Sequence, residues 1–503
     1  MTQSRTFKAA ILSSGQFLVT LASLISATVL SRLFTKEDYA AYRQTLLAYA
    51  FVAPLLALGL PQALYYFIPR DRENSRSILT GNLLLLFLMG GIFAVAIWCG
   101  GNQLLANRFN NPAISRLLLI YSPYALLALP VSTVSACLMS CNRVKMLAIY
   151  NVASRILTVV FIIGLVLIWR TPKASIGATV LAELIIFAPA IVLMYRATAG
   201  TGWLPDIANI RQQIKYSVPL GIASMIGIIS MNLDKVIVSS MCTPENFAVY
   251  ANAAIEIPLI GILTGSVTAV LMPDIVRFYK EGNKAAALEL WKRSGVKCAM
   301  ILLPAMCFLF VMAPEVMRVL FSDKYNDSVH PFRIYLLLLP IRTVTWGPML
   351  MAAGKSSWIL SRTGSTLLFN LILSIILVSQ LGYIGAAIST VAVTYLWAVP
   401  YNTIAISKLY GFPLCKIFPF RDIFVITVLA ILGTFVCMMK QYLPSLSDFV
   451  RLAIISPLYM LTVVFLMQRF GPPSVRNRPS DLIDLVANRV IGTSINWIKK
   501  NLL

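Results

Sequence analysis

Long apolar stretches alternate with short polar connections along almost the whole chain. A helix needs about 20 predominantly apolar residues to cross the hydrocarbon core of a bilayer. By that criterion the pattern predicts fourteen membrane-spanning helices, near residues 8–33, 40–68, 77–99, 115–140, 146–169, 174–196, 214–240, 247–274, 297–318, 332–352, 359–380, 384–407, 422–440 and 451–468. Prolines interrupt the second, eighth and tenth of these segments. The sequence therefore predicts an all-α polytopic membrane protein.

A twelve-residue string near the N-terminus recurs 208 positions later in altered form. SRLFTKEDYAAY at Ser31–Tyr42 returns as SSMCTPENFAVY at Ser239–Tyr250. Identical residues stand at the pairs Ser31/Ser239, Thr35/Thr243, Glu37/Glu245, Ala40/Ala248 and Tyr42/Tyr250. Each copy links two apolar segments, and six segments separate the copies, so the pattern predicts two parallel six-helix lobes. Duplicated bundles of this kind are typical of secondary transporters.

The duplication predicts the domain organisation. We expect an N-lobe with helices 1–6, a cytoplasmic linker, a C-lobe with helices 7–12, two further helices, and a cytoplasmic amphipathic tail. These parts correspond to residues 1–200, 201–215, 216–410, 411–470 and 471–503. The stretch Asn283–Lys297 carries apolar residues at helical spacing, which favours a short helix lying at the membrane surface.

Charge gives the orientation. The chain is 58% hydrophobic with a formal net charge of +23, and its basic residues lie mainly in short connections between apolar segments. The connections on one side hold more than twice as many Lys and Arg residues as those on the other. The positive-inside rule therefore places both termini in the cytoplasm. The same distribution argues against binding to nucleic acid.

Signatures of catalytic and metal sites are missing from the sequence. The eight cysteines form no CxxC motif, and His330 is the single histidine. Cys137 and Cys141 share a helix face, where small apolar packing residues are the simpler interpretation. The sequence has no phosphate-binding GxxxxGK[ST] loop, no HExxH motif and no nucleophile elbow. We expect no enzyme activity, metal or cofactor.

Ionisable residues inside the predicted spans are the candidates for function, because each costs roughly 2.5–3.5 kcal/mol to insert. They are Arg43, Arg155, Glu183, Asp234, Lys235, Glu256 and Arg342. Four basic and three acidic groups would make a slightly cationic interior, which suits a phosphate or diphosphate. The alternative is internal pairing, of Arg155 with Glu183 and of Lys235 with Glu256. Arg43 and Arg342 have no obvious acidic partner in the sequence.

The segment Tyr216–Tyr279 carries a family resemblance. It contains YSVPLGIASMIGIISMNLDKVIVSSM, then PENFAVYANA, then a helix ending in LMPDIVRFY. Together with SRLFTKEDYAAY and two extra C-terminal spans, it resembles the oligosaccharide flippases of the multidrug/oligosaccharidyl-lipid/polysaccharide exporter superfamily. The resemblance implies a transporter that flips polyprenyl-diphosphate-linked oligosaccharide repeat units to the periplasmic leaflet by alternating access, for surface polysaccharide biosynthesis. Its implied partners are that substrate, membrane lipids and a polysaccharide polymerase/chain-length complex.

The resemblance also implies roles for the charged residues. The substrate-binding candidates are Arg43, Lys235, Arg342 and Arg155. Coupling to a proton or sodium gradient would use Asp234, Glu256 and Glu183. The alternatives are a drug/cation antiporter or a lipid II flippase of the same superfamily, or a non-transporting membrane component of polysaccharide assembly. The first span has no arginine between Lys8 and Arg32, which argues against a lipid II flippase.

Overall fold

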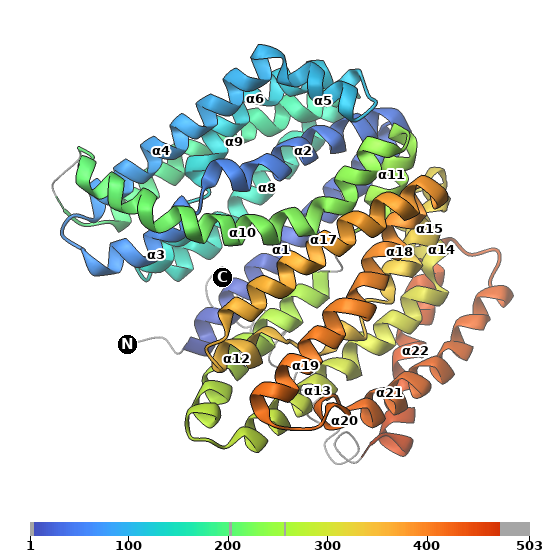
Figure 1. The fold of residues 1–503 in the computed structure, drawn as a ribbon. Helices are drawn as coiled ribbons and strands as arrows, with labels where there is room; N and C mark the ends of the chain where they lie inside the picture. Colours follow the sequence, from blue (N-terminus) through green and yellow to red (C-terminus); the bar gives the residue numbers. More distant parts are fainter. Residues whose placement is uncertain (1–4, 201–203, 256–257, 473–503) are drawn as a thin grey trace, which may run out of the picture. The chain divides into compact units, whose positions relative to one another are not determined.

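The computed structural model describes residues 5–200, 204–255 and 258–472, and the regular structure in these ranges is helical throughout (Figure 1). The first part of the chain forms the helices α1 (Arg5–Leu33), α2 (Lys36–Ala57), α3 (Leu60–Arg70), α4 (Ser75–Ala96), η1 (Ile97–Gly101), α5 (Asn102–Arg108), α6 (Ala113–Val131), α7 (Val134–Ser140), α8 (Val144–Trp169), α9 (Pro172–Ala197), α10 (Ile207–Met241) and α11 (Pro244–Ala253).

The second part of the chain continues with helices of more varied length, and short 3-10 or π segments join several of them. They are α12 (Pro258–Lys280), α13 (Lys284–Val311), α14 (Ala313–Phe321), η2 (Asp323–Ser328), α15 (Val329–Leu336), η3 (Ile341–Thr343), α16 (Gly347–Ala352), α17 (Ser356–Leu381), α18 (Tyr383–Val393), η4 (Thr394–Ala398), α19 (Val399–Tyr410), α20 (Leu414–Ile417), α21 (Phe420–Gly433), η5 (Thr434–Tyr442) and α22 (Asp448–Phe470).

The helices confirm the predicted fold class. Eleven of them are long and apolar enough to cross a membrane, and two bent pairs raise the number to thirteen if each pair is one span. The chain is therefore an all-helical, multi-pass membrane protein. The predicted count of fourteen is not reached within the described ranges. The eighth predicted segment, residues 247–274, is divided between α11 and α12, and residues 256–257 between them lie outside the described chain.

The chain divides into two compact units. The N-terminal unit consists of residues 18–251 with 378–383, and the C-terminal unit of residues 252–377 and 384–472 with 5–17. α10 and α11 thus belong to the N-terminal unit, because α10 packs along α2, α3 and α4. The predicted division at residues 201–215 does not coincide with this boundary, and residues 207–215 of the predicted linker already belong to α10.

In the N-terminal unit α4 packs on α6, α6 on α9 and α9 on α8 (Figure 1). Close packing requires small residues here. A Cβ added at Gly90 on α4 would lie 2.6 Å from the carbonyl oxygen of Ala125 on α6. The two backbones are therefore in contact, as small residues permit between membrane helices.

The second predicted span is broken, as its prolines indicated. α2 ends at Ala57 and α3 begins at Leu60, and between them Leu58 and Gly59 have left-handed backbone conformations with φ of 46° and 72°. A Cβ on Gly59 would lie 2.5 Å from the carbonyl oxygen of Ser217 and 2.6 Å from the backbone nitrogen of Gly221, both on α10. The break is therefore held directly against the backbone of α10.

The stretch Asn283–Lys297 is not a separate surface helix, contrary to the prediction. The side chain of Asn283 accepts a hydrogen bond from the backbone N–H of Ala286 at 3.0 Å, and it starts α13, which continues to Val311 without a break. Trp291 is fully buried against Trp346, and its indole N–H donates to the carbonyl oxygen of Thr345 at 2.8 Å. The apolar face of this stretch packs on protein rather than on lipid.

The two additional C-terminal helices pack on α13. Leu303 of α13, Ile426 of α21 and Tyr459 of α22 share one buried cluster. The Tyr459 hydroxyl lies 3.0 Å from the carbonyl oxygen of Pro304 and 3.2 Å from that of Ala430, so it links all three helices. Of the predicted amphipathic tail at residues 471–503, residues 473–503 lie outside the described chain.

Candidate functional site

The two copies of the repeated string start helices in the same way. Thr35 precedes α2 and accepts a hydrogen bond from the backbone N–H of Asp38 at 3.1 Å. Thr243, 208 positions later, precedes α11 and accepts one from the backbone N–H of Asn246 at 3.3 Å. Such N-caps satisfy backbone donors that a helix leaves unpaired. The matching threonines therefore have a structural role, and the charges around them are the candidates for function.

The segments that carry the two copies also meet within the N-terminal unit. The Arg43 guanidinium on α2 donates to the carbonyl oxygen of Ala251 at 3.3 Å, and each of these residues directly follows its copy of the string. The neighbouring Gln44 donates to the Ser239 hydroxyl at 2.9 Å. The residues that follow the first copy therefore bond to the second copy and its neighbour at a junction of α2, α10 and α11. Arg43 lies at this junction, half-buried, with its guanidinium 5.9 Å from the centre of the Tyr39 ring.

Arg155 and Glu183 do not pair in the structure. The Arg155 guanidinium on α8 donates instead to the hydroxyl of Ser23 on α1 at 2.5 Å. Glu183 on α9 is 9% exposed and makes neither an ion pair nor a hydrogen bond with any described residue. Both groups belong to the N-terminal unit, and neither one accounts for the presence of the other in the membrane.

Asp234 of α10 has the hydrogen bonds of a structural group. Its carboxylate accepts from the Tyr250 hydroxyl at 2.7 Å and from the backbone N–H of Lys235 at 2.8 Å. Tyr250 is the last residue of the second copy, so this bond ties α10 to α11. Lys235 makes no ion pair within the described chain. Glu256 lies outside the described residues, so its predicted pairing with Lys235 stays a prediction.

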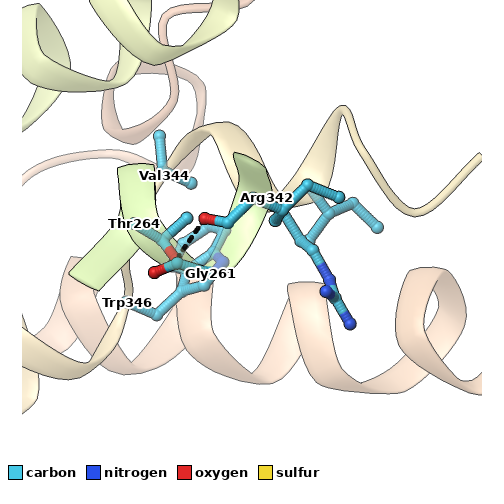
Figure 2. Close-up of a pocket in the computed structure, with 7 residues that line it drawn as sticks. Gly261, Thr264, Arg342, Val344 and Trp346 are labelled. Atoms are coloured by element: carbon cyan, nitrogen blue, oxygen red, sulfur yellow. Dashed lines mark hydrogen bonds between the residues drawn. The ribbon is translucent and has the colours of Figure 1, made fainter. Parts of the chain in front are cut away.

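Arg342 lies beside a cavity of about 350 Å³ in the C-terminal unit (Figure 2). The cavity lies between α12 and the irregular segment around η3, and its lining consists of Ile260, Gly261, Thr264, Ile341, Arg342, Val344 and Trp346. Figure 2 shows Gly261, Thr264 and Trp346 close together, whereas the Arg342 guanidinium extends away from them. The volume lies within the range of about 300–1,000 Å³ that is common for small-molecule sites.

The backbone around Arg342 explains its position. Asp323–Leu336 and Leu339–Ala352 meet at an angle of 44°, and Arg342 lies in the first turn after this break. Irregular backbone at membrane depth is tolerated where it lines a cavity, and broken helices of this kind form binding sites in transporters. The exposed Arg342 side chain has no ion pair or hydrogen-bond partner among the described residues. Its donors are therefore available to an anion such as a phosphate.

The structure thus separates the predicted site residues. Arg43, Arg155, Glu183, Asp234 and Lys235 belong to the N-terminal unit, whereas Arg342 belongs to the C-terminal unit. The described part of the chain holds no cluster of three or more His, Cys, Asp or Glu side chains that could bind a metal ion.

Two features were missed from the sequence. Arg362 lies inside α17, half-buried, and its Nε atom is buried without a partner. Its place within a predicted span was the signal that could have identified it. The second feature is a group of tyrosines around Glu183, for which the tyrosines inside the second, fourth and fifth predicted helices were the signal.

Comparisons with known proteins agree with this architecture. A family model described as polysaccharide biosynthesis protein matches residues 29–330. The chain is 21% identical over 188 residues to a protein of Haloferax volcanii named probable low-salt glycan biosynthesis flippase Agl15, over 37% of this chain and 40% of that protein. It is 29% identical over 114 residues to the probable lipid II flippase MurJ of Rhizobium meliloti, over 23% of this chain and 21% of that protein. The similarity therefore spans less than half the length of either relative.

The fold matches a solved structure over nearly its whole length. The lipid II flippase MurJ in an inward closed conformation superposes with a TM-score of 0.73, and it covers 91% of this chain and 99% of its own. The sequence identity in that comparison is 16%, so the likeness concerns the fold alone.

Proposed function

Because this chain belongs to the polysaccharide biosynthesis protein family, we propose that it flips lipid-linked oligosaccharides across the membrane for surface polysaccharide biosynthesis. The substrate would be a polyprenyl-diphosphate-linked repeat unit, moved from the cytoplasmic to the periplasmic leaflet by alternating access. The observation that carries the proposal is the unpaired Arg342 beside a cavity at the break of a membrane helix. A guanidinium in that position can bind a diphosphate through two parallel hydrogen bonds.

The other basic groups have supporting roles in this proposal. Lys235 makes no ion pair with the described residues, and it would add a point charge to the substrate path. Arg43 and Arg155 already bond to a carbonyl oxygen and a hydroxyl, and both acceptors are neutral. Each guanidinium therefore keeps its full positive charge for a passing headgroup.

The proposal also specifies the membrane in which the protein acts and its orientation there. The excess of basic residues on one side supports an inner-membrane protein with both termini in the cytoplasm. Such a protein moves its substrate without changing it chemically, so we do not propose an enzyme. Membrane lipids surround it, and a polysaccharide polymerase/chain-length complex would receive its product. A lipid II flippase or a drug/cation antiporter is the alternative within the same superfamily, and the cationic excess within the spans argues against a cationic drug.

We expect the Arg342→Ala variant to lose surface polysaccharide while its abundance in the membrane stays normal. The change removes the guanidinium beside the cavity but no hydrogen bond or ion pair of the described chain. Surface polymer and the lipid-linked intermediate are measured in a strain that depends on this protein, and the intermediate should accumulate. Arg333→Ala is the matched control, because Arg333 lies on the same bent segment but donates to the carbonyl oxygen of Phe310 at 2.9 Å.

A second variant tests the cavity independently of charge. A Cβ added at Gly261 meets no atom within 4 Å, so Gly261→Leu should fill the cavity without disturbing the fold. Gly265→Leu is its control, since Gly265 is equally open but does not line the cavity. Normal polymer in both Arg342→Ala and Gly261→Leu would contradict the proposed site.

A further inference from the structure

Aromatic side chains gather at the surface where α3 packs on α10 in the N-terminal unit (Figure 1). The rings of Tyr66 on α3 and Tyr216 on α10 stack, with their centroids 4.6 Å apart and their planes 16° from parallel. Phe67 of α3 lies edge-on to both rings, at 5.1 Å from Tyr66 and 5.5 Å from Tyr216. These three residues are here termed the aromatic platform. Tyr66 is 39% exposed and Tyr216 is 41% exposed, so the stack lies outside the core.

The backbone beneath the platform is fixed by direct contacts of α10 with its neighbours. Gly59, at the start of α3, lies against the backbone of Ser217, the residue after Tyr216. Asn82 of α4 donates to the side-chain oxygen of Gln213, one turn before Tyr216, at 3.0 Å. Both of these amide side chains are fully buried. The platform is therefore preorganised, and a ligand would not have to order its backbone on binding.

Polar groups accompany the rings on both helices. Gln62, Tyr66 and Arg70 follow one another at four-residue intervals, so they share one face of α3. The Arg70 guanidinium donates to the Tyr66 hydroxyl and lies 5.5 Å from the centre of the Tyr66 ring. The side-chain oxygen of Gln62 is buried and accepts no hydrogen bond within the described chain. On α10 the exposed Gln212 lies four residues before Tyr216. The surface thus combines aromatic faces with amide and guanidinium groups.

Tyrosines near a membrane surface also serve as anchors in the lipid headgroup region. Such anchors need only single amphipathic rings, and Tyr65 shows that arrangement. It is 46% exposed, takes no part in the stack, and its hydroxyl contacts the sulfur of Met139 at 3.6 Å. Tyr66 and Tyr216 instead stack on one another, and the Tyr66 hydroxyl already bonds to Arg70. The mutual stacking and the polar neighbours indicate a surface that binds a ligand rather than lipid.

A sugar ring matches this combination of groups. One side of a pyranose ring is lined with C–H bonds and is apolar, whereas its hydroxyl groups project from the edge as donors and acceptors. The C–H side can lie on an aromatic face, whose negative potential attracts it. Amide and guanidinium groups beside the ring can then hydrogen-bond the hydroxyls. A polyprenyl chain would need no polar groups at this surface, and a bare phosphate would need no aromatic ones.

The platform lies on the side of the membrane to which the basic residues assign the cytoplasm. Arg70 ends α3 and is followed by Arg72 in the connection to α4, and Lys215 directly precedes Tyr216. A substrate taken from the cytoplasmic leaflet would present its glycan on this side at the start of transport.

We propose that the aromatic platform is a carbohydrate-binding subsite, which holds a sugar ring of the lipid-linked oligosaccharide before the substrate crosses the membrane. Stacking supplies affinity for the ring, and Gln62, Arg70 and Gln212 recognise its hydroxyl groups. The residues of this subsite are different from those of the diphosphate site at Arg342, which belongs to the C-terminal unit. The role of the subsite in transport rests on the proposed function, whereas its affinity for sugar does not.

Sugar binding can be measured without any transport assay. The probe is the free repeat-unit oligosaccharide, released by mild acid from the lipid-linked intermediate and therefore without lipid or diphosphate. Saturation-transfer NMR with full-length protein in lipid nanodiscs should show transfer to the C–H protons of the sugar. The double variant Tyr66→Leu/Tyr216→Leu should reduce this transfer to the level of empty nanodiscs. Tyr66→Phe/Tyr216→Phe should retain it, because the ring faces remain.

Tyr65→Leu is the matched control and should leave the transfer unchanged, because it removes an equally exposed tyrosine outside the platform. Gel filtration and the unfolding temperature show whether each variant is folded. If the double variant does not fold, Tyr216→Leu alone takes its place, since Tyr216 is an exposed residue. No transfer in the wild type, transfer that persists in the folded Leu variant, or loss of transfer in Tyr65→Leu would each overturn the proposal.

The role in transport needs a second measurement. In a strain that depends on this protein, the Leu variant should export little polymer and accumulate the lipid-linked intermediate, whereas the Phe variant should export normally. Normal export in the Leu variant would overturn this role even if sugar binding is confirmed. Normal export in Arg342→Ala would contradict the flippase site and leave the NMR result intact.

Discussion

At the scale of single residues, two intramembrane arginines of the N-terminal unit bond to neutral groups rather than to acids. Arg43 donates to a carbonyl oxygen and Arg155 to a hydroxyl. An ion pair would cancel the charge of each partner, whereas these bonds fix a guanidinium in place and preserve its charge. Glu183 is consequently left without a counter-charge. Pairing by opposite sign along the sequence was the wrong expectation for Arg155 and Glu183.

Gly59 provides a prediction about a single residue. Its φ of 72° and the 2.5 Å between an added Cβ and the carbonyl oxygen of Ser217 leave no room for a side chain. Gly59→Ala should destabilise the protein by at least about 1–3 kcal/mol, through backbone strain and a shift of α10. Gly164→Ala, within α8 and with nothing within 4 Å, should be neutral or stabilising by roughly 0.5–1 kcal/mol. Thermal unfolding of the two purified variants measures the difference, and equal stabilities would contradict the packing.

At the scale of elements, an ionic network joins α22 to α14. Arg318 of α14 makes two hydrogen bonds to Asp448 at the start of α22, at 2.7 and 3.1 Å. Beside it, Lys440 forms an ion pair with the buried Glu315 at 3.2 Å. α22 also packs on α13 through Tyr459, so its position is fixed at one end by charge and along its length by apolar contacts.

Arg318→Ala should loosen this attachment by about 2 kcal/mol, because it leaves the partly buried Asp448 without its bidentate partner. Arg293→Ala is the comparison, since it removes the exposed pair with Glu289 on α13 and should cost less than about 0.5 kcal/mol. Limited proteolysis of the η5–α22 connection in purified protein reports the difference. Cleavage rates that match between the two variants would show that α22 does not depend on the network.

At the scale of the whole molecule, the duplication does not coincide with the compact units. The second copy of the repeated string lies in the N-terminal unit together with the first, and Arg43 and Gln44, which follow the first copy, bond there to Ala251 and Ser239. The repeat therefore describes how the sequence arose, whereas the unit boundary at Ala251–Asn252 describes how the helices pack. The two predicted lobes remain predictions.

Orientation is a prediction at the same scale. Cys415 is exposed in α20, just before α21, on the side to which the basic residues assign the cytoplasm. With the other cysteines replaced, a membrane-impermeant maleimide should label Cys415 only in inside-out vesicles. A Ser445→Cys variant without Cys415 should show the reverse, because Ser445 lies in the exposed connection between η5 and α22. The opposite labelling pattern would invert the topology and with it the proposed direction of transport.

By itself, the sequence determined the features that depend only on residues close together along the chain. Apolar length predicted the membrane helices, and Pro54 and Pro61 predicted the break that the structure places at Leu58–Gly59, because a helix requires only its own backbone and the bilayer. The caps at Thr35 and Thr243 follow from the same local chemistry.

Tertiary structure alone decided which groups meet. Helix packing makes Ser23 the hydrogen-bond partner of Arg155 and buries Trp291 against Trp346. It also forms the cavity beside Arg342 and brings tyrosines near Glu183. These outcomes depend on which helix packs beside which, and residues far apart in the sequence decide that. The hydropathy of one segment holds no information about its neighbour, so the charges could be found in the sequence, but their partners could not.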